Sequence, residues 1–337
     1  MSLTTAILSL LLQTSGTDAG GMAAYTIRPG DTRAGVASVL IHPADLDAVL
    51  RANGAPTGVL QAGRTVRFPM RLLRQIPLRA SVVAVRGDVH ASGLALTRPG
   101  ARLGEGTLIV TGADSAIGLR LPDGSVVTLP SASRIRIERL RRTALTRIFD
   151  RRFSLEAGRS EYNVVPNHRF GSRFEIRTPV SVAAVRGTIF RVSLPDSASA
   201  NAEVLRGEVG VQGRVATISL PKGFGAHSDV QSAGTPIELL PAPEIERVST
   251  GADGGEAVEL GSVPGAVRYR VQLSPTPDFV SLLAEQLADA PSVNLKATPF
   301  GVYYLRATAI DSHGLEGLPD VVQYEHKSVL GSRPTGK

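Results

Sequence analysis

The sequence contains no cysteine and no tryptophan, and aromatic residues make up only 4% of its 337 positions. The absence of cysteine excludes disulfide bonds, thiol catalysis and thiolate metal sites. Lysine is also scarce, so arginine carries almost all of the positive charge behind the net charge of +7. No segment is apolar over the roughly 20 residues that a transmembrane helix needs. We therefore expect a protein without a membrane-spanning helix.

Motifs of catalytic and cofactor sites are missing as well. The six histidines show no metal-ligand spacing, and no G-x-S-x-G, H-E-x-x-H or phosphate-binding glycine loop occurs. We expect no enzymatic activity, no cofactor and no metal site. A carboxylate pair that only the fold brings together would escape this test, so hydrolysis of glycan or peptide remains an alternative.

Glycine (35 residues) and proline (22 residues) are plentiful. This composition favours many short strands joined by tight turns over long packed helices. With 42% hydrophobic residues, the chain is long enough for two or three domains with cores of their own. The predicted fold is mostly β.

The arginines are dispersed along the chain with few aromatic residues between them, which argues against a nucleic-acid partner. The most basic stretch is Arg141–Arg152. It could contact phosphate or carboxylate groups, but such a run is more often a solvated strand or hairpin. We favour a solvated strand or hairpin.

Three related copies of one pattern, an apolar run followed by Arg-Gly, occur at Ala84–Val89, Ala184–Ile189 and Val204–Val209. Glycine inside a strand marks a bulge, a bend or a close backbone approach. The copies therefore predict a repeated β-unit in which the glycines bend the strands. We also expect the arginines of the copies to pair with neighbouring acids such as Asp88 or Glu208.

Residues 1–24 resemble a secretory signal peptide. An apolar run over residues 6–12 is followed by small residues, with possible cleavage after Ala19 or Ala24. We therefore expect a periplasmic or secreted protein.

Residues 25–69 predict a small β-α-α-β module. Asp31 or Thr32 is placed to cap the first helix, and Asn53-Gly54 ends the second. The apolar spacing of the second helix predicts that one set of residues faces inward. This set comprises Leu46, Val49 and Leu50.

The letters Y-T-I-R-P-G-D-T, Asn53 and V-L-Q-A-G-R-T-V-R-F-P in this module resemble a LysM domain over its whole length. The resemblance implies binding of N-acetylglucosamine-containing glycan, above all peptidoglycan, in a shallow groove between the Gly-Asp-Thr turn and the loop before the last strand. A cap and a ligand contact can share one turn. The implied contact residues are Gly30, Asp31, Thr32, Arg33, Thr57, Gly58, Val59 and Leu60.

Residues 79–235 resemble a FecR domain. The resemblance rests on R-T-P-V-S-V-A-A-V-R-G-T, on the hairpin A-I-G-L-R-L-P-D-G-S-V-V-T-L, and on the order of the remaining strands, including R-I-R-I-E-R-L with Ile135, Ile137 and Leu140 on one face. It implies an extracytoplasmic all-β module, which an open roll, a sandwich and a short solenoid would all fit. Its structural core motif comprises Arg177, Thr178, Pro179, Val185, Arg186, Gly187 and Thr188.

Residues 70–78 and 236–247 are predicted linkers, and residues 326–337 a flexible tail. Between the second linker and the tail, residues 248–325 alternate as the strands of a β-sandwich do and resemble a fibronectin type III domain. The residues expected to fill its core are Tyr269, Val271, Tyr304 and Ala307.

These observations favour a non-enzymatic envelope protein that binds peptidoglycan through the LysM-like module and presents the other two modules to a protein partner. FecR sensors carry a cytoplasmic anti-sigma segment and a membrane helix, and this sequence shows neither, so we expect no direct anti-sigma role. The alternative is a periplasmic sensing component that relays a state to a separate membrane regulator.

Overall fold

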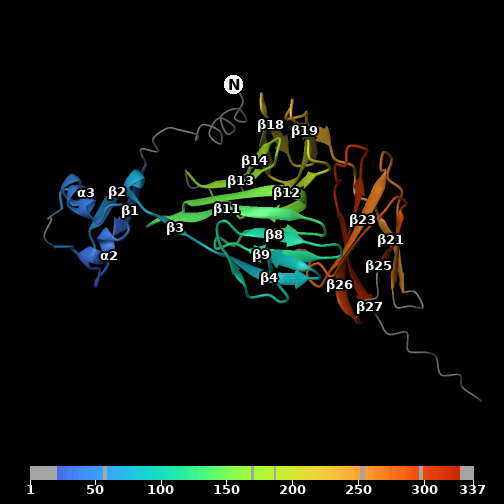
Figure 1. Cartoon of the computed structure of the whole chain (residues 1–337), viewed down its shortest axis with the longest axis horizontal. Coiled ribbons are helices and arrows are strands. Elements are labelled where there is room, and N and C mark those ends of the chain that lie inside the picture. The colour runs from blue at the N-terminus through green and yellow to red at the C-terminus, as the bar shows by residue number, and fades with distance from the viewer. Residues whose placement is uncertain are drawn as a thin grey trace, which may run out of the picture.

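The computed structural model describes residues 21–55, 59–167, 171–185, 187–250, 255–295 and 299–326. Three bodies follow one another along the chain: a small N-terminal module, a large β-roll and a C-terminal sandwich (Figure 1). In these described ranges every helical segment precedes Gln75, and every regular element after it is a strand. The predicted mostly-β fold is confirmed.

The N-terminal module has the predicted order of strand, two α-helices and strand, with a short 3-10 segment leading directly into the second helix. Its two strands pair antiparallel, from Met22 opposite Pro69 to Thr26 opposite Thr65. The module therefore begins at Met22 in the structure, three residues before the expected boundary. Leu46, Val49 and Leu50 are buried, as the helical spacing predicts. Its elements are β1 (Met22–Thr26), α2 (Arg33–Ala37), η1 (Pro43–Asp45), α3 (Leu46–Ala52) and β2 (Thr65–Pro69).

The segment expected to be the first linker is built into the fold. It forms η2 (Met70–Leu72) and β3 (Gln75–Pro77), and β3 pairs with the end of β11 (Arg134–Thr143). Ala144, at the tip of the following turn, is 1% exposed and lies in the hydrophobic core of the N-terminal module. Its backbone N–H donates to the Arg74 carbonyl over 2.9 Å. The module is thus packed against the roll.

Strands β3–β20 form one closed hydrogen-bonded system of two facing sheets that share the long strand β12 (Phe149–Asn163). The first half of β12 pairs with β11 and runs parallel to β13, and its second half pairs with β10 and β15. The sequence fitted an open roll, a sandwich or a short solenoid, and the structure differs from all three because its two layers close into one roll.

The first sheet also contains β5 (Val89–Ala91), β6 (Leu94–Ala95), β8 (Leu108–Thr111), β13 (Arg173–Arg177), β14 (Val182–Val185), β17 (Glu208–Gln212) and β18 (Thr217–Pro221). The second sheet contains β4 (Ala80–Arg86), β7 (Arg102–Leu103), β9 (Ala116–Arg120), β10 (Val126–Leu129), β15 (Ile189–Leu194), β16 (Ser199–Arg206), β19 (Phe224–Asp229) and β20 (Ile237–Glu238).

The space between the two sheets is filled by one apolar core. Ile135, Ile137 and Leu140 of β11 are fully buried in it, as their alternation predicts. At its centre the rings of Tyr162 and Phe190 stack with centroids 4.7 Å apart. Aromatic pairs of this kind add to the burial of apolar area.

The three Arg-Gly copies mark corners where the chain crosses from one sheet of the roll to the other. Gly87 lies between β4 and β5, Gly187 between β14 and β15, and Gly207 between β16 and β17. Their φ angles of +71°, +72° and +84° lie in the left-handed region. The glycines thus permit the predicted bends, but at the ends of strands, because a corner needs a conformation that other residues adopt at a cost.

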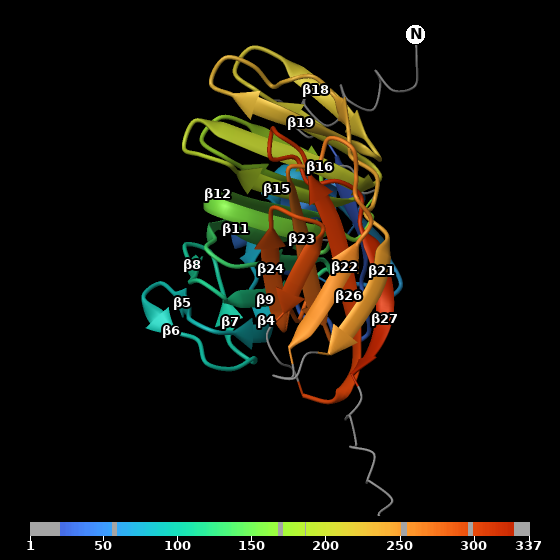
Figure 2. The same cartoon turned by 90° about the vertical axis from the view of Figure 1, so that its right-hand side faces the viewer.

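The sandwich consists of a three-stranded and a four-stranded sheet (Figure 2). Tyr269, Val271 and Ala307 are buried in its core, as predicted. Tyr304 is not part of that core: Tyr303 takes this place, and Tyr304 packs against the apolar cluster around Phe279, at the roll. The sheets are β21 (Ile245–Thr250), β22 (Glu256–Leu260) and β25 (Ser292–Leu295), and β24 (Ala284–Ala288), β23 (Arg268–Ser274), β26 (Gly301–Ile310) and β27 (Asp320–His326).

The segment expected to be the second linker belongs to both of its neighbours. Its strand β20 pairs with β19 of the roll, and Leu239 is buried. The Leu240 carbonyl accepts a hydrogen bond from the Leu318 N–H of the sandwich over 2.9 Å. The roll and the sandwich are therefore joined by more than a flexible tether.

Candidate functional sites

The Gly-Asp-Thr turn of the N-terminal module is held by its own side chains. Oδ2 of Asp31 accepts hydrogen bonds from the Arg28 N–H (2.8 Å) and the Tyr25 hydroxyl (2.7 Å). These two bonds lower the pKa of the Asp31 carboxyl. Thr32 caps α2, because its Oγ1 accepts from the Gly35 N–H over 3.0 Å. Both side chains are used to shape the turn, so a ligand would meet its backbone and outer surface.

The other predicted contact residues are spread around this turn. Arg33 donates to Oδ1 of Asp47 over 2.6 Å, which directs its guanidinium toward α3. Val59 is 68% exposed, and Leu60 packs partly against the core of the module. Thr57 and Gly58 lie outside the described residues.

Asn53, which helped to identify the module, joins α3 to β2. Its Nδ2 donates to the carbonyls of Val49 and Arg67, and its Oδ1 accepts from the Arg67 N–H. The Asn53 side chain thus caps the end of α3 and also forms the hydrogen bonds to the Arg67 backbone that a neighbouring strand would otherwise form.

The residues of the R-T-P core motif build the turns of the roll. Oγ1 of Thr178 accepts from the Ser181 N–H over 2.9 Å and shapes the turn from β13 to β14 at Pro179. Val185 and Thr188 are buried. Arg177 lies 3.6 Å from Glu138 on the outer face, and Arg186 lies outside the described residues.

The predicted pairing with Asp88 or Glu208 is wrong for Arg86 and Arg206, the two repeated arginines that the structure describes. Asp88 approaches His90 (3.3 Å), and Glu208 bonds to the Ser219 hydroxyl. Arg206 donates instead to Asn163, at 3.5 Å. Burial lowers the pKa of Arg86, against the attraction of the more distant Glu285 and Asp114. The corner turns carry Asp88 and Glu208 away from these guanidinium groups.

Residues 107–210 match the family model described as FecR protein. Residues 107–210 of the roll are therefore similar to FecR proteins, and we refer to the roll as the FecR domain below. No curated protein matches the chain. No helix in the described part of the chain is long and apolar enough to cross a membrane.

Solved structures resemble parts of the chain at low similarity. Two structures of an inferred anti-sigma factor from Parabacteroides distasonis share 21% identity over 39% of this chain, with a TM-score of 0.32. The chain spans 58% of their length. The FN1–FN3 domains of chicken CNTN1 match 75% of this chain and all of their own at 12% identity, with a TM-score of 0.23. At these scores the likeness carries no argument about function.

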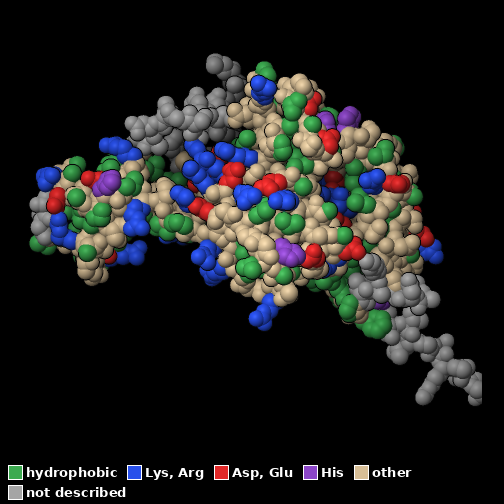
Figure 3. Space-filling model, viewed as in Figure 1, with side chains coloured by type: hydrophobic (Ala, Val, Ile, Leu, Met, Phe, Trp, Pro, Cys, Tyr) green, Lys and Arg blue, Asp and Glu red, His purple; other side chains and the backbone are tan. Residues whose placement is uncertain are grey.

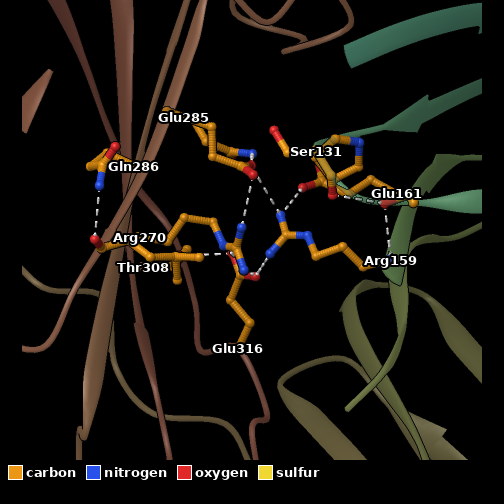
Figure 4. A network of polar contacts seen from close by, with 12 residues as sticks. Ser131, Arg159, Glu161, Arg270, Glu285, Gln286, Thr308 and Glu316 are labelled. Atoms are coloured by element: carbon orange, nitrogen blue, oxygen red, sulfur yellow. Dashed lines mark hydrogen bonds and ion pairs between the residues drawn. The ribbon is translucent and has the colours of Figure 1, made fainter. Parts of the chain in front are cut away.

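A buried network of arginine and glutamate, which no sequence motif indicated, joins the FecR domain to the sandwich (Figure 4). At its centre lies Glu316, 4% exposed, in the turn between β26 and β27. Its carboxylate bonds to Arg159 of β12 and lies 2.7 Å from Arg191 of β15 and 3.2 Å from Arg270 of β23. Although burial alone would raise it, these arginines hold the pKa of Glu316 well below its ordinary value.

The network continues to both sides of this centre. Arg306 of the sandwich donates to both oxygens of Glu161 in β12 over 2.8 Å, and Arg270 lies 3.1 Å from Glu285. Nearby, Gly118 of β9 leaves room for the sandwich, because a Cβ at this position would lie 2.5 Å from the Val280 carbonyl oxygen. The outer face of the second sheet is thus an interface between domains.

Glu203 of β16 is the exception within this network. It is 1% exposed, its Oε1 accepts only a long hydrogen bond from the Glu316 N–H (3.3 Å), and its Oε2 has no partner among the described residues. Burial raises the pKa of Glu203 to about 7, against the attraction of Arg191. Glu203 therefore titrates near neutral pH while its neighbour Glu316 stays ionised.

The outer face of the first sheet also carries many charges. Positive and negative side chains are interspersed over the middle of the face in Figure 3, where Figure 1 places β11, β12 and β13. Glu156 lies within 3.0 Å of both Arg134 and Arg136. The stretch from Arg141 to Arg152 forms a hairpin, from the end of β11 to the start of β12. The expectation that it is solvated is wrong in part, because Thr143, Ala144 and Arg151 are buried.

Proposed function

We propose that this chain is a non-enzymatic cell-envelope protein, periplasmic or secreted, that binds N-acetylglucosamine-containing glycan through its N-terminal module. Its FecR domain and sandwich are presented to a protein partner. The observation that supports glycan binding is the preformed turn from Gly30 to Arg33, which is fixed by hydrogen bonds within the module. A sugar that meets a preformed surface need not order it, which lowers the cost of binding.

The attachment of the module gives this binding a consequence for the FecR domain. Because Ala144 of the roll fills the core of the module, a bound glycan strand would orient the roll as well. Contact with each repeat unit through one shallow turn is expected to be weak, so firm attachment would come from several sites on the same polymer.

The test uses the chain from residue 21 onward and purified sacculi, with sedimentation as the readout. A fragment of residues 20–75 is unsuitable, since it lacks Ala144 of the module core. The variant is Val59→Asp, in the predicted contact loop, and the control is Val215→Asp, because Val215 is 83% exposed in the FecR domain far along the chain. We expect the wild type and the control to sediment, and Val59→Asp to stay in solution.

Wild-type protein that remains in the supernatant at both low and moderate salt would refute glycan docking. Equal sedimentation of Val59→Asp and of the wild type would place the contact elsewhere. Soluble muropeptides that accumulate over time would contradict the non-enzymatic assignment, because a binding protein releases none.

The FecR match favours a second candidate function, a sensing or regulatory component of the envelope that acts on a separate membrane regulator. This candidate predicts that Val59→Asp leaves the regulatory output unchanged, whereas the docking proposal predicts that it is lost together with localisation. A point variant is the better test, since deletion of the module would expose Ala144 and Leu145 of the roll.

A further inference from the structure

Two arginines of the basic hairpin have no side-chain partner in the part of the chain that the structure describes. The hairpin stretch from Arg141 to Arg152 contains five arginines. Arg142 and Arg147 make no side-chain hydrogen bond or ion pair with the described residues, and the Nε of Arg142 is buried without a partner. The other three are neutralised: Arg141 by Glu105, Arg151 by Asp123 and Arg152 by Asp150.

Both unpaired arginines line the same cavity, which has a volume of about 720 Å³. Arg142 reaches it from the end of β11 and Arg147 from the turn between β11 and β12. Asn167 also lines the cavity, and its Nδ2 donates to the Arg147 carbonyl over 2.9 Å, which holds this part of the rim together. A cavity of this size is typical of small-molecule sites.

The remaining walls limit the chemistry of a ligand. Phe149, Val165 and Pro122 are apolar and would contact a hydrophobic part of it. Two unpaired guanidinium groups favour an anion, since they present several N–H donors. Asp123 also lies in the wall, with its carboxylate held by the buried Arg151. The negative charge of Asp123 would repel a doubly charged phosphate more strongly than a singly charged anion, so the site favours the latter.

We propose that this cavity binds the carboxylate of a small, partly apolar acid, and that this acid is the peptide stem of peptidoglycan. The second step rests on the proposed glycan docking. Ala144, three residues before Arg147, lies in the core of the N-terminal module, so the cavity lies beside the module that would hold the glycan. One polymer would then occupy two sites, its sugars at the module and a stem carboxylate at the arginines.

The probe is N-acetylmuramyl-L-alanyl-D-isoglutamine, which has one free carboxylate, titrated calorimetrically into the chain from residue 21 onward. We expect Arg142→Gln and Arg147→Gln each to weaken binding about tenfold, the effect of one charge-assisted hydrogen bond. Arg139→Gln is the matched control, because Arg139 belongs to the same strand as Arg142. Its partner Asp150 would still form an ion pair with Arg152 in this variant. It should bind as the wild type does.

The outcomes separate this proposal from the docking proposal. If sacculi sediment the wild type but the muramyl peptide binds both arginine variants as tightly as the wild type, or binds none of the proteins, the cavity assignment is wrong and docking stands. If Val59→Asp fails to sediment but still binds the muramyl peptide, both proposals hold.

Displacement of the probe by an equal concentration of inorganic phosphate would overturn the preference for carboxylate. Because Arg147 is exposed, Arg147→Gln should fold as the wild type does, and weaker binding by this variant would not be due to misfolding.

Discussion

Replacing Glu203 by glutamine tests the electrostatics of the interface between the FecR domain and the sandwich. Glu203 is buried, and its Oε2 has no partner among the described residues. An ionised carboxylate in this position is destabilising, whereas a protonated one resembles an amide in charge and shape. Glu203→Gln should therefore stabilise the protein when the wild-type carboxylate is ionised and change little when it is protonated.

The size of the effect follows from the pKa of Glu203, about 7 against an ordinary value of 4.5. In the unfolded chain the carboxyl loses its proton near the ordinary value, whereas in the folded chain it keeps the proton up to about 7. Between these values the folded state binds more protons, so the stability that Glu203 contributes is lost as the pH rises. The shift corresponds to about 3 kcal/mol at roughly 1.4 kcal/mol per pH unit.

The measurement is denaturant unfolding of the wild type and the variant at pH 5, 6, 7 and 8, followed by circular dichroism because the chain has no tryptophan. We expect the stability advantage of Glu203→Gln to grow by about 2–3 kcal/mol between pH 5 and pH 8. Glu259→Gln, at a half-exposed position of the sandwich, is the control and should show no such growth. An advantage of the same size at all four pH values would refute a near-neutral titration of Glu203.

Three further results are expected. Glu316→Gln should destabilise the protein at pH 7 by about 3–5 kcal/mol in the same unfolding assay, because it leaves three buried arginines with less counter-charge. Gly187→Val should cost about 2–4 kcal/mol without loss of sacculus binding, since its φ is +72° and a Cβ would lie 2.9 Å from Pro166. Ala144→Asp should make residues 21–77 sensitive to protease while the roll stays resistant, because a carboxylate would enter the core of the module.

Local signals in the sequence predicted the local structure. Thr32 caps α2 and Asn53 ends α3 as their residue types suggest, because capping depends on neighbours only a few residues away. The hairpin from β9 to β10 follows from Pro122-Asp123-Gly124 between alternating runs. The alternation of Ile135 and Ile137 correctly identified the buried face of β11.

The interface between domains could not be predicted in the same way. Arg159 and Glu161 alternate with buried residues along β12, and this pattern is the same for a face in water and for a face covered by another domain. Glu316 follows D-S-H-G-L, whose residue types are typical of an exposed turn and indicate no burial of the next residue. Arg159 and Glu316 are removed from water by the packing of the sandwich on the roll, a contact between residues far apart in the sequence.

Buried contacts join all three bodies of the chain: the packing of Ala144 joins the module to the roll, and buried charges join the roll to the sandwich. A glycan at the N-terminal module would fix the roll through Ala144, and the roll would fix the sandwich through the arginines around Glu316. An apolar interface would be insensitive to pH, whereas this one contains Glu203, whose ionisation places a further negative charge beside Glu316. Since like charges in a buried site repel strongly, the contact between the FecR domain and the sandwich should weaken above neutral pH, while the packing of Ala144 in the module is unaffected.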